Sequence, residues 1–323
     1  MNAPAIVHSP REQWLLARRE WLSDGPVLTA SDIAAILNED EHRGPLAVAL
    51  AKRGDTPEDN LAMRRGRRFE RAIGEEYSEQ AGRPVTPWPA YELVTHPDIP
   101  WLKATPDALT AGSPASPDPF GGAVAESRDG RVVGSAPLQI KMAIGSAKEW
   151  KDEPPLAYVI QTNVEMACLG ASWGVLAGLV GPGPLATADL VRDKQFFAAM
   201  LPHLEAFRAL LARGELPEAD AKPGTSEAIR RFWANANGET VPLEASDMQL
   251  VQAWEKCGDQ EAAAKVAGDV VENMLRRRLG AAAFGALPDG TFLSLKKTYR
   301  SGYTVQPCEY RVLRRFRPRL RRR

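Results

Sequence analysis

Apolar residues recur along the first two thirds of the chain at helical spacing. Phe69, Ile73 and Tyr77 follow one another at intervals of four, and Gly82 comes soon after them, so a helix is predicted over residues 67–80. The same kind of spacing predicts helices over residues 13–21, 158–169 and 193–213. Capping residues predict a further helix start at Thr29, Ala30, Ser31 and Asp32.

Apolar runs of another kind lie between these helices. Alternating or unbroken apolar residues predict strands over residues 91–94, 101–109, 138–142 and 173–180. Residues 110–122 are dense in turn-forming residues, and Asp129 and Gly130 lie between two short apolar runs, so residues 110–137 are predicted as an insertion with a small hairpin. The order of helices and strands predicts an α/β fold.

The pattern changes after residue 215. Residues 216–225 form a polar linker, and residues 246–279 show a long helical pattern that Gly258 and Gly268 can divide into a hairpin. A short β-like segment over residues 292–305 follows. We therefore expect a core over residues 10–215, a helical and β-hairpin accessory region over residues 216–309 and a tail over residues 310–323.

Composition changes this picture little. The 323 residues are 44% apolar and 25% charged, which is ordinary for a globular protein and excludes collagen and wholesale disorder. The net charge of zero hides an asymmetry, because eight of the 41 basic residues are arginines of the tail, which has no acid, and leave 33 basic against 41 acidic residues in the rest. Overall neutrality is thus no argument against a nucleic-acid partner.

Cysteine spacing and hydropathy exclude two further classes. Cys168, Cys257 and Cys308 are far apart, so neither a zinc module nor a disulfide scaffold is expected. The longest apolar stretch, residues 171–180, is about half of a membrane span. We expect a cytoplasmic protein, of a bacterial or phage-infected bacterial cell, with no membrane partner.

The candidate chemistry lies on two predicted neighbouring strands. Pro106 and Asp107 are followed by Gln139, Ile140 and Lys141, and strand alternation turns Gln139 and Lys141 to the same side. An acid, an oxygen ligand and a lysine together suit a metal-dependent phosphodiesterase, because hard cations such as Mg²⁺ prefer oxygen ligands and activate bound water. Lys141 would hold or help deprotonate that water.

Four motifs in order resemble the YqaJ-type viral recombinase nucleases, relatives of the phage lambda exonuclease in the PD-(D/E)XK superfamily. The motifs are residues 29–32 (TASD), residues 66–70 (GRRFE), residues 101–109 (WLKATPDAL) and residues 138–141 (LQIK), with Gln161 after them. The resemblance covers about residues 10–215. It implies a restriction-endonuclease-like core, a central mixed sheet flanked by helices, and an exonuclease that uses Mg²⁺, with Mn²⁺ as a substitute.

The resemblance also implies roles and partners. Asp107, Gln139 and Glu70 match metal-binding and catalytic positions, with the backbone carbonyl of Ile140, and Lys141 matches the motif lysine. Residues that match the 5′-phosphate site are Ser31, Thr105 and Gln161. The implied activity is 5′ to 3′ digestion of linear duplex DNA from its ends in phage-type recombination. The implied partners are a single-strand annealing protein and two further copies in a ring-shaped trimer.

Two departures from the family pattern matter. Gln139 replaces a carboxylate by a neutral amide, which should weaken metal binding unless another acid compensates, and Glu165 and Glu126 are candidates, with Glu165 favoured because it shares a helix face with Gln161. The arginine expected before residues 29–32 lies further upstream, as Arg18 or Arg19, and spacing does not decide between them.

Two further questions about function stay open at the level of sequence. A cluster of arginines can be a DNA-facing surface or a solvated helix face, and comprises Arg64, Arg65, Arg67, Arg68 and Arg71. If Gln139 has abolished turnover, the protein is instead a catalytically weakened DNA-end-binding scaffold for recombination.

Overall fold

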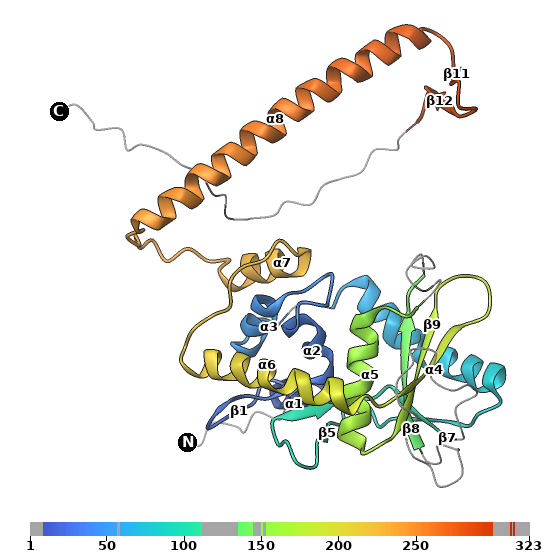
Figure 1. Cartoon of the computed structure of the whole chain (residues 1–323), viewed down its shortest axis with the longest axis vertical. Helices are drawn as coiled ribbons and strands as arrows, with labels where there is room; N and C mark the ends of the chain where they lie inside the picture. The colour runs from blue at the N-terminus through green and yellow to red at the C-terminus, as the bar shows by residue number, and fades with distance from the viewer. Residues whose placement is uncertain are drawn as a thin grey trace, which may run out of the picture. The chain divides into compact units, whose positions relative to one another are not determined.

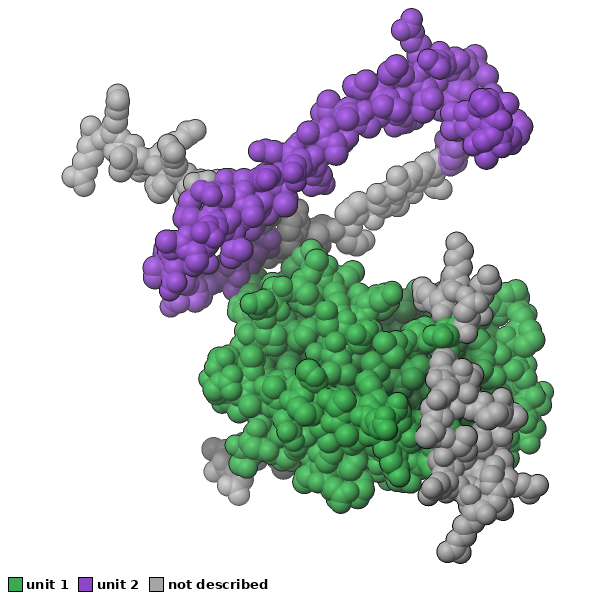
Figure 2. Space-filling view, in the orientation of Figure 1, with its two compact units in different colours: residues 1–234 green, residues 235–323 purple. Residues whose placement is uncertain are grey.

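The computed structural model describes residues 9–56, 59–111, 135–144, 150, 153–299, 311 and 313. The chain divides into two compact units, residues 1–234 and residues 235–323, which Figure 2 colours green and purple. None of the helices in the described ranges is long and apolar enough to cross a membrane.

The first unit is built on a mixed five-stranded sheet. Its strands, in spatial order, are β10 (Ala186–Val191), β9 (Trp173–Leu179), β8 (Ser135–Met142), β7 (Ala108–Ala111) and β4 (Val85–Pro87). Among the described strands of this sheet, only β8 and β9 pair in parallel, and the helix between them is α5 (Leu156–Leu169). This crossover is the βαβ connection that a parallel pair requires.

Helices α4 (Leu61–Ala81) and α5 cover opposite faces of this sheet (Figure 1). Ile140 of β8 packs on the α4 side with Ile73 and Tyr77. On the other face α5 approaches β9 so closely that a Cβ at Gly174 would lie 3.0 Å from Thr162 and 3.1 Å from Met166. The predicted α/β class, a central mixed sheet flanked by helices, is confirmed.

A second group of elements packs against the far side of α5. A three-stranded sheet contains β3 (Leu28–Thr29), β6 (Leu102–Ala104) and β5 (Val94–Thr95), and a hairpin contains β1 (Trp21–Leu22) and β2 (Gly25–Pro26). The helices of this group are α1 (Pro10–Ala17), α2 (Ala30–Ile36), α3 (Pro45–Lys52), α6 (Lys194–Ala212) and α7 (Pro223–Phe232). Their largest shared core includes Leu28, Ile33, Leu102, Ile160 and Leu204.

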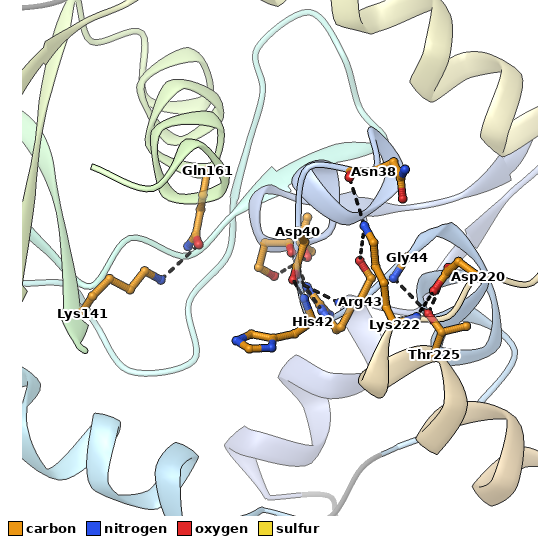
Figure 3. A network of polar contacts seen from close by, with 12 residues as sticks. Asn38, Asp40, His42, Arg43, Gly44, Lys141, Gln161, Asp220, Lys222 and Thr225 are labelled. Atoms are coloured by element: carbon orange, nitrogen blue, oxygen red, sulfur yellow. Dashed lines mark hydrogen bonds and ion pairs between the residues drawn. The ribbon is translucent and has the colours of Figure 1, made fainter. Parts of the chain in front are cut away.

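Polar contacts fix α7 and the segment before it to the loop between α2 and α3 (Figure 3). Lys222 Nζ donates to Asn38 O at 3.0 Å, and the backbone N–H of Gly44 donates to Thr225 Oγ1 at 3.0 Å. The first unit therefore extends to Ala234 and includes α7, which the predicted boundary at residue 215 assigns to the accessory region.

The second unit contains one long helix and a short hairpin. Helix α8 (Ala245–Leu279) is continuous through Gly258 and Gly268, so the expected division into a helical hairpin is wrong. The hairpin contains β11 (Phe284–Ala286) and β12 (Phe292–Ser294). The β-like segment predicted over residues 292–305 is therefore a strand only to Ser294, and residues 300–305 lie outside the described residues.

The predicted strand over residues 101–109 is two strands in two sheets. Pro106 has no N–H for a ladder, and the chain leaves β6 and enters β7 through Thr105, Pro106 and Asp107. The strand predicted over residues 91–94 is also wrong, because Tyr91 has φ of 64° and lies in a turn before β5. The hairpin predicted around Asp129 and Gly130 lies outside the described residues.

Candidate functional site

Asp107 lies where the chain crosses from one sheet to the other. The β7–β8 register pairs Ala108 with Leu138, which brings Asp107 beside Gln139 and Ile140. Asp107 Oδ2 accepts hydrogen bonds from the backbone N–H of Ile140 at 2.7 Å and from the side-chain amide of Gln139. The acid is therefore anchored to the strand that carries the rest of the motif.

Gln139 and Lys141 lie on the same side of β8, as strand alternation predicts, and this side faces α5. Gln161 of α5 joins them, because its Nε2 donates to Gln139 Oε1 at 2.8 Å. Figure 3 shows its second contact, in which Gln161 Oε1 accepts from Lys141 Nζ at 3.2 Å. The Lys141 ammonium also lies 4.8 Å from the centre of the Tyr158 ring. The helix thus holds the lysine at the edge of the acidic group.

Glu165 completes this group one helical turn after Gln161. Gln161 Nε2 donates to Glu165 Oε1 at 2.9 Å, so the two residues share a helix face as predicted. The side chain is fully buried, and Glu165 Oε2 has no hydrogen-bond partner among the described residues. Burial, and then the charge of Asp107, raise the pKa of Glu165 to about 8.

Glu70 of α4 belongs to the same electrostatic group from the other side. Burial and the charge of Asp107 raise its pKa to about 7, while Lys141 partly offsets them. Burial also raises the pKa of Asp107 itself. The pKa values of two carboxyl groups, Glu70 and Glu165, are raised first by burial and then by the charge of Asp107, which indicates a concentration of negative charge that a cation would relieve.

The donor chemistry suits a hard divalent cation that keeps water ligands. Within the described ranges, no group of three or more Asp, Glu, His or Cys side chains is placed to hold a metal ion by itself. A complete ligand set would therefore need neutral oxygens, which Gln139 Oε1 and the Ile140 carbonyl can supply beside one or two carboxylates. For Gln139 this requires its amide to turn, because the amide N–H donates to Asp107.

A second polar group forms around Ser31 in α2. Arg18 Nη2 donates to Ser31 Oγ at 2.7 Å and to Thr29 Oγ1 at 3.2 Å, and burial lowers the pKa of Arg18. Its guanidinium stacks 4.4 Å above the ring of Trp14, whose Nε1 donates to Thr105 Oγ1 at 3.0 Å. The Arg18 guanidinium is therefore brought together with the hydroxyls of Thr29 and Ser31 and, through Trp14, with the hydroxyl of Thr105.

Arg19 lies elsewhere. Its guanidinium donates to the backbone carbonyl of Gly54 at 3.3 Å and to Thr56 Oγ1 at 2.8 Å. Of the two arginines that spacing leaves open, Arg18 is the one beside Ser31.

A buried ion pair of Asp32 and Lys52 lies beneath this group, and the sequence predicts only that Asp32 lies at the start of a helix. Both side chains are buried, and Lys52 Nζ donates to Asp32 Oδ2 at 2.8 Å and to the backbone carbonyl of Arg18 at 2.7 Å. Asp32 Oδ2 also accepts from the Thr29 N–H at 2.9 Å. Burial alone would raise the pKa of Asp32, but Lys52 and Arg18 lower it well below its usual range. No local signal at Lys52 predicts this pairing.

The arginines of α4 are exposed at its amino-terminal half. Arg67 pairs with Asp59, and Arg71 with Glu75 at 2.8 Å. The remaining arginines of the cluster, which are also exposed, are Arg64, Arg65 and Arg68. The other acid considered for charge compensation, Glu126, lies outside the described residues.

Comparison with known proteins adds a family match. Residues 13–172 match the family model of the YqaJ-like viral recombinase domain. No curated protein matches the chain significantly.

Similar solved structures include LHK-Exo in complex with dAMP, with 23% sequence identity and a TM-score of 0.47 over 63% of this chain and 93% of that one. They also include the alkaline exonuclease LHK-Exo from Laribacter hongkongensis, with 22% identity and a TM-score of 0.45 over the same shares. The structure of SSO0001 is 11% identical with a TM-score of 0.31 over 62% of this chain and 85% of that chain.

Proposed function

Because residues 13–172 belong to the YqaJ-like viral recombinase family, we propose that the protein is a metal-dependent exonuclease that digests linear duplex DNA in phage-type homologous recombination. One observation carries the proposal: the 105–107 turn joins the basic group at Ser31 to the acidic group at Asp107. A phosphate held by Arg18 and Thr105 would place the adjoining phosphodiester beside the carboxylates.

The acidic group is proposed to hold the divalent ion. Asp107, Gln139 Oε1 and the Ile140 carbonyl would be ligands, with Glu70 and Glu165 supplying further carboxylates. When bound, such an ion neutralises charge on the leaving oxygen and lowers the pKa of the attacking water. Mg²⁺ is the proposed ion, with Mn²⁺ as a substitute, because both bind oxygen ligands and can keep water in the coordination positions that the protein does not fill.

Lys141 would act on the water rather than on the ion. Its ammonium is fixed by Gln161 and by the Tyr158 ring, which leaves further N–H donors to orient a nucleophile. Gln161 holds Lys141, Gln139 and Glu165 at once, so it would position the site as well as contact a phosphate.

The basic group is proposed to bind a terminal 5′-phosphate, which sets 5′ to 3′ polarity. Arginine and hydroxyl donors are the usual phosphate partners, and the Arg18 guanidinium is already directed at Ser31 and Thr29. A chain end that lacks this phosphate would lose its charge-assisted hydrogen bonds to Arg18, which costs affinity.

Three exposed arginines of α4, Arg64, Arg65 and Arg68, are proposed to contact the DNA backbone. Changing Arg64, Arg65 and Arg68 to Ala should reduce the slope of log affinity against log salt by about 0.9 per lost phosphate contact. A slope equal to that of the wild type would contradict this role. Arg71→Ala provides a control, because Arg71 is paired with Glu75.

A catalytically weakened end-binding scaffold is the second candidate function. The side-chain amide of Gln139 donates a hydrogen bond to Asp107. A neutral amide therefore stands where a carboxylate would add a negative charge to the metal site. A scaffold of this kind would bind 5′-phosphorylated DNA ends without releasing nucleotides.

Nucleotide release from linear duplex DNA distinguishes the two functions. Wild type in Mg²⁺ or Mn²⁺ should release nucleotides faster from 5′-phosphorylated than from 5′-hydroxyl ends, and Asp107→Ala and Lys141→Ala should abolish release while end binding persists. End binding by the wild type without release in either ion would favour the scaffold. Nicking of closed circular DNA would show an endonuclease instead.

Two partners are proposed on the family match alone. The protein would act with a single-strand annealing protein, and three copies would form a ring around DNA. Sedimentation of the full chain should give three times its 35.3 kDa mass, and a monomer would exclude the ring.

A further inference from the structure

Tyr91 lies beside the proposed phosphate site in a conformation that costs energy. Its φ of 64° falls in the left-handed region, which bulky side chains avoid and which indicates that the surroundings hold the residue there. The turn is fixed at its base, because Trp88 Nε1 donates to Glu92 O at 3.0 Å and the Trp88 N–H donates to Asp107 O at 3.2 Å. The strained tyrosine is thus tied to the backbone of the acidic site.

The edge of the aromatic pair formed by Tyr91 and Trp14 adjoins the proposed phosphate site. The ring centres of Tyr91 and Trp14 are 5.8 Å apart with their planes at 60°, and Trp14 carries the Arg18 guanidinium on its ring and Thr105 on its indole nitrogen. Trp14 therefore touches two proposed phosphate ligands and Tyr91 at once.

The Tyr91 ring is partly open to solvent. Tyr91 is 39% exposed, and its positive φ and the contact with Trp14 fix where its ring lies. A fixed, partly exposed ring next to a phosphate-binding cation has the features of a surface on which a nucleobase stacks, and stacking tolerates every base because each has a π face.

We propose that Tyr91, supported by Trp14, stacks on the base of the terminal nucleotide whose 5′-phosphate is bound by Arg18. The proposal rests on the proposed exonuclease function and adds a base-binding subsite to it. This subsite would favour an end whose terminal base is present over an end that carries only sugar and phosphate, without preference for one base.

The test compares two 5′-phosphorylated duplexes, one with a normal terminal nucleotide and one with an abasic terminal residue. Binding is measured by fluorescence anisotropy in EDTA, which prevents digestion, and KM is measured in Mg²⁺. Wild type should bind the normal end about fivefold or more tightly than the abasic end, the ratio expected for one stacked base. Equal binding of the two ends by the wild type would overturn the proposal.

Three variants assign the effect to the ring. Tyr91→Asn removes it while accepting the positive φ, because Asn is common in that region, and should bring the two ends to equal affinity. Tyr91→Phe keeps the ring and should retain the preference. Trp233→Leu, which removes another exposed aromatic of the first unit, should behave as wild type. A full preference in Tyr91→Asn would refute the role of the ring.

The outcomes separate this proposal from the exonuclease function. If the wild type prefers the normal end in EDTA but releases no nucleotide in Mg²⁺ or Mn²⁺, the stacking subsite stands and the exonuclease function fails. If it releases nucleotides but binds both ends equally, the exonuclease function stands and the subsite fails.

Discussion

Exchanging the amide and the carboxylate at positions 139 and 165 would identify the residue that supplies the missing charge of the acidic group. Gln139 and Glu165 are both buried, and Gln161 hydrogen-bonds to each, at 2.8 and 2.9 Å. If Glu165 compensates for Gln139, Glu165→Gln should weaken binding of the divalent ion, and the double variant Gln139→Glu with Glu165→Gln should restore it, because the charge count is the same.

The raised pKa of Glu165 sets the expected magnitude. With a pKa of about 8, its carboxyl group is mostly protonated at pH 7, and removing that proton before metal binding costs about 1.4 kcal/mol. The apparent metal affinity should therefore rise with pH below 8, by up to about tenfold per pH unit for this proton. Glu165→Gln should remove that part of the dependence and weaken binding about 10- to 100-fold at pH 8.

Calorimetric titration of the metal-free protein with Mg²⁺ or Mn²⁺ at pH 6, 7 and 8 measures both effects. Glu75→Gln is the matched control, because Glu75 is an exposed carboxylate of α4 paired with Arg71. Equal affinity and equal pH dependence in wild type and Glu165→Gln would refute compensation by Glu165. A double variant as weak as Glu165→Gln would show that a carboxylate at position 139 cannot take its place.

Three further predictions follow from the same contacts. Glu165 keeps its proton to about pH 8 in the folded protein but only to its ordinary pKa in the unfolded chain. The free energy of unfolding of the metal-free protein should therefore fall as pH rises from about 5 to 8 and then level off. Urea denaturation of Glu165→Gln should show a smaller fall, and an identical fall would contradict the prediction. Arg18→Lys, which cannot form the same fork to Ser31, should raise KM for 5′-phosphorylated ends about tenfold or more, whereas Arg19→Lys should match wild type; equal effects would argue against the assignment. Lys52→Met leaves the carboxylate of Asp32 buried without its ion pair and should lower the free energy of unfolding by about 3–5 kcal/mol in urea, and a loss below about 1 kcal/mol would show that the pair is not needed.

Elements with a long and regular apolar period were predictable from the sequence. The helices predicted over residues 67–80, 158–169 and 193–213 correspond to α4, α5 and α6, and Gly82 and Gly170 adopt the left-handed φ of a helix end. Short elements were missed, because α3 and β10 take their stability from neighbours rather than from their own pattern. In the 101–109 segment Pro106 is a local signal against one continuous strand, but the sheet that each half joins depends on long-range pairing.

The candidate site was predictable where it depends on order along the chain. Strand alternation brought Gln139 and Lys141 to one side, and helical spacing joined Gln161 to Glu165. The choice between Arg18 and Arg19 depends on how α1 packs against α2, and spacing across the intervening hairpin carries no information about it. The Lys52 contact is long-range in the same way.

The break between β6 and β7 has a consequence for product length. Thr105 faces the basic group and Asp107 the acidic group, and a single proline, with its backbone φ fixed by the ring, separates them. On the proposed function, this turn sets the distance between the bound chain end and the bond to be cut. Because the turn is short, this distance would correspond to one nucleotide. The enzyme would then release mononucleotides at every step, whatever the length of the duplex.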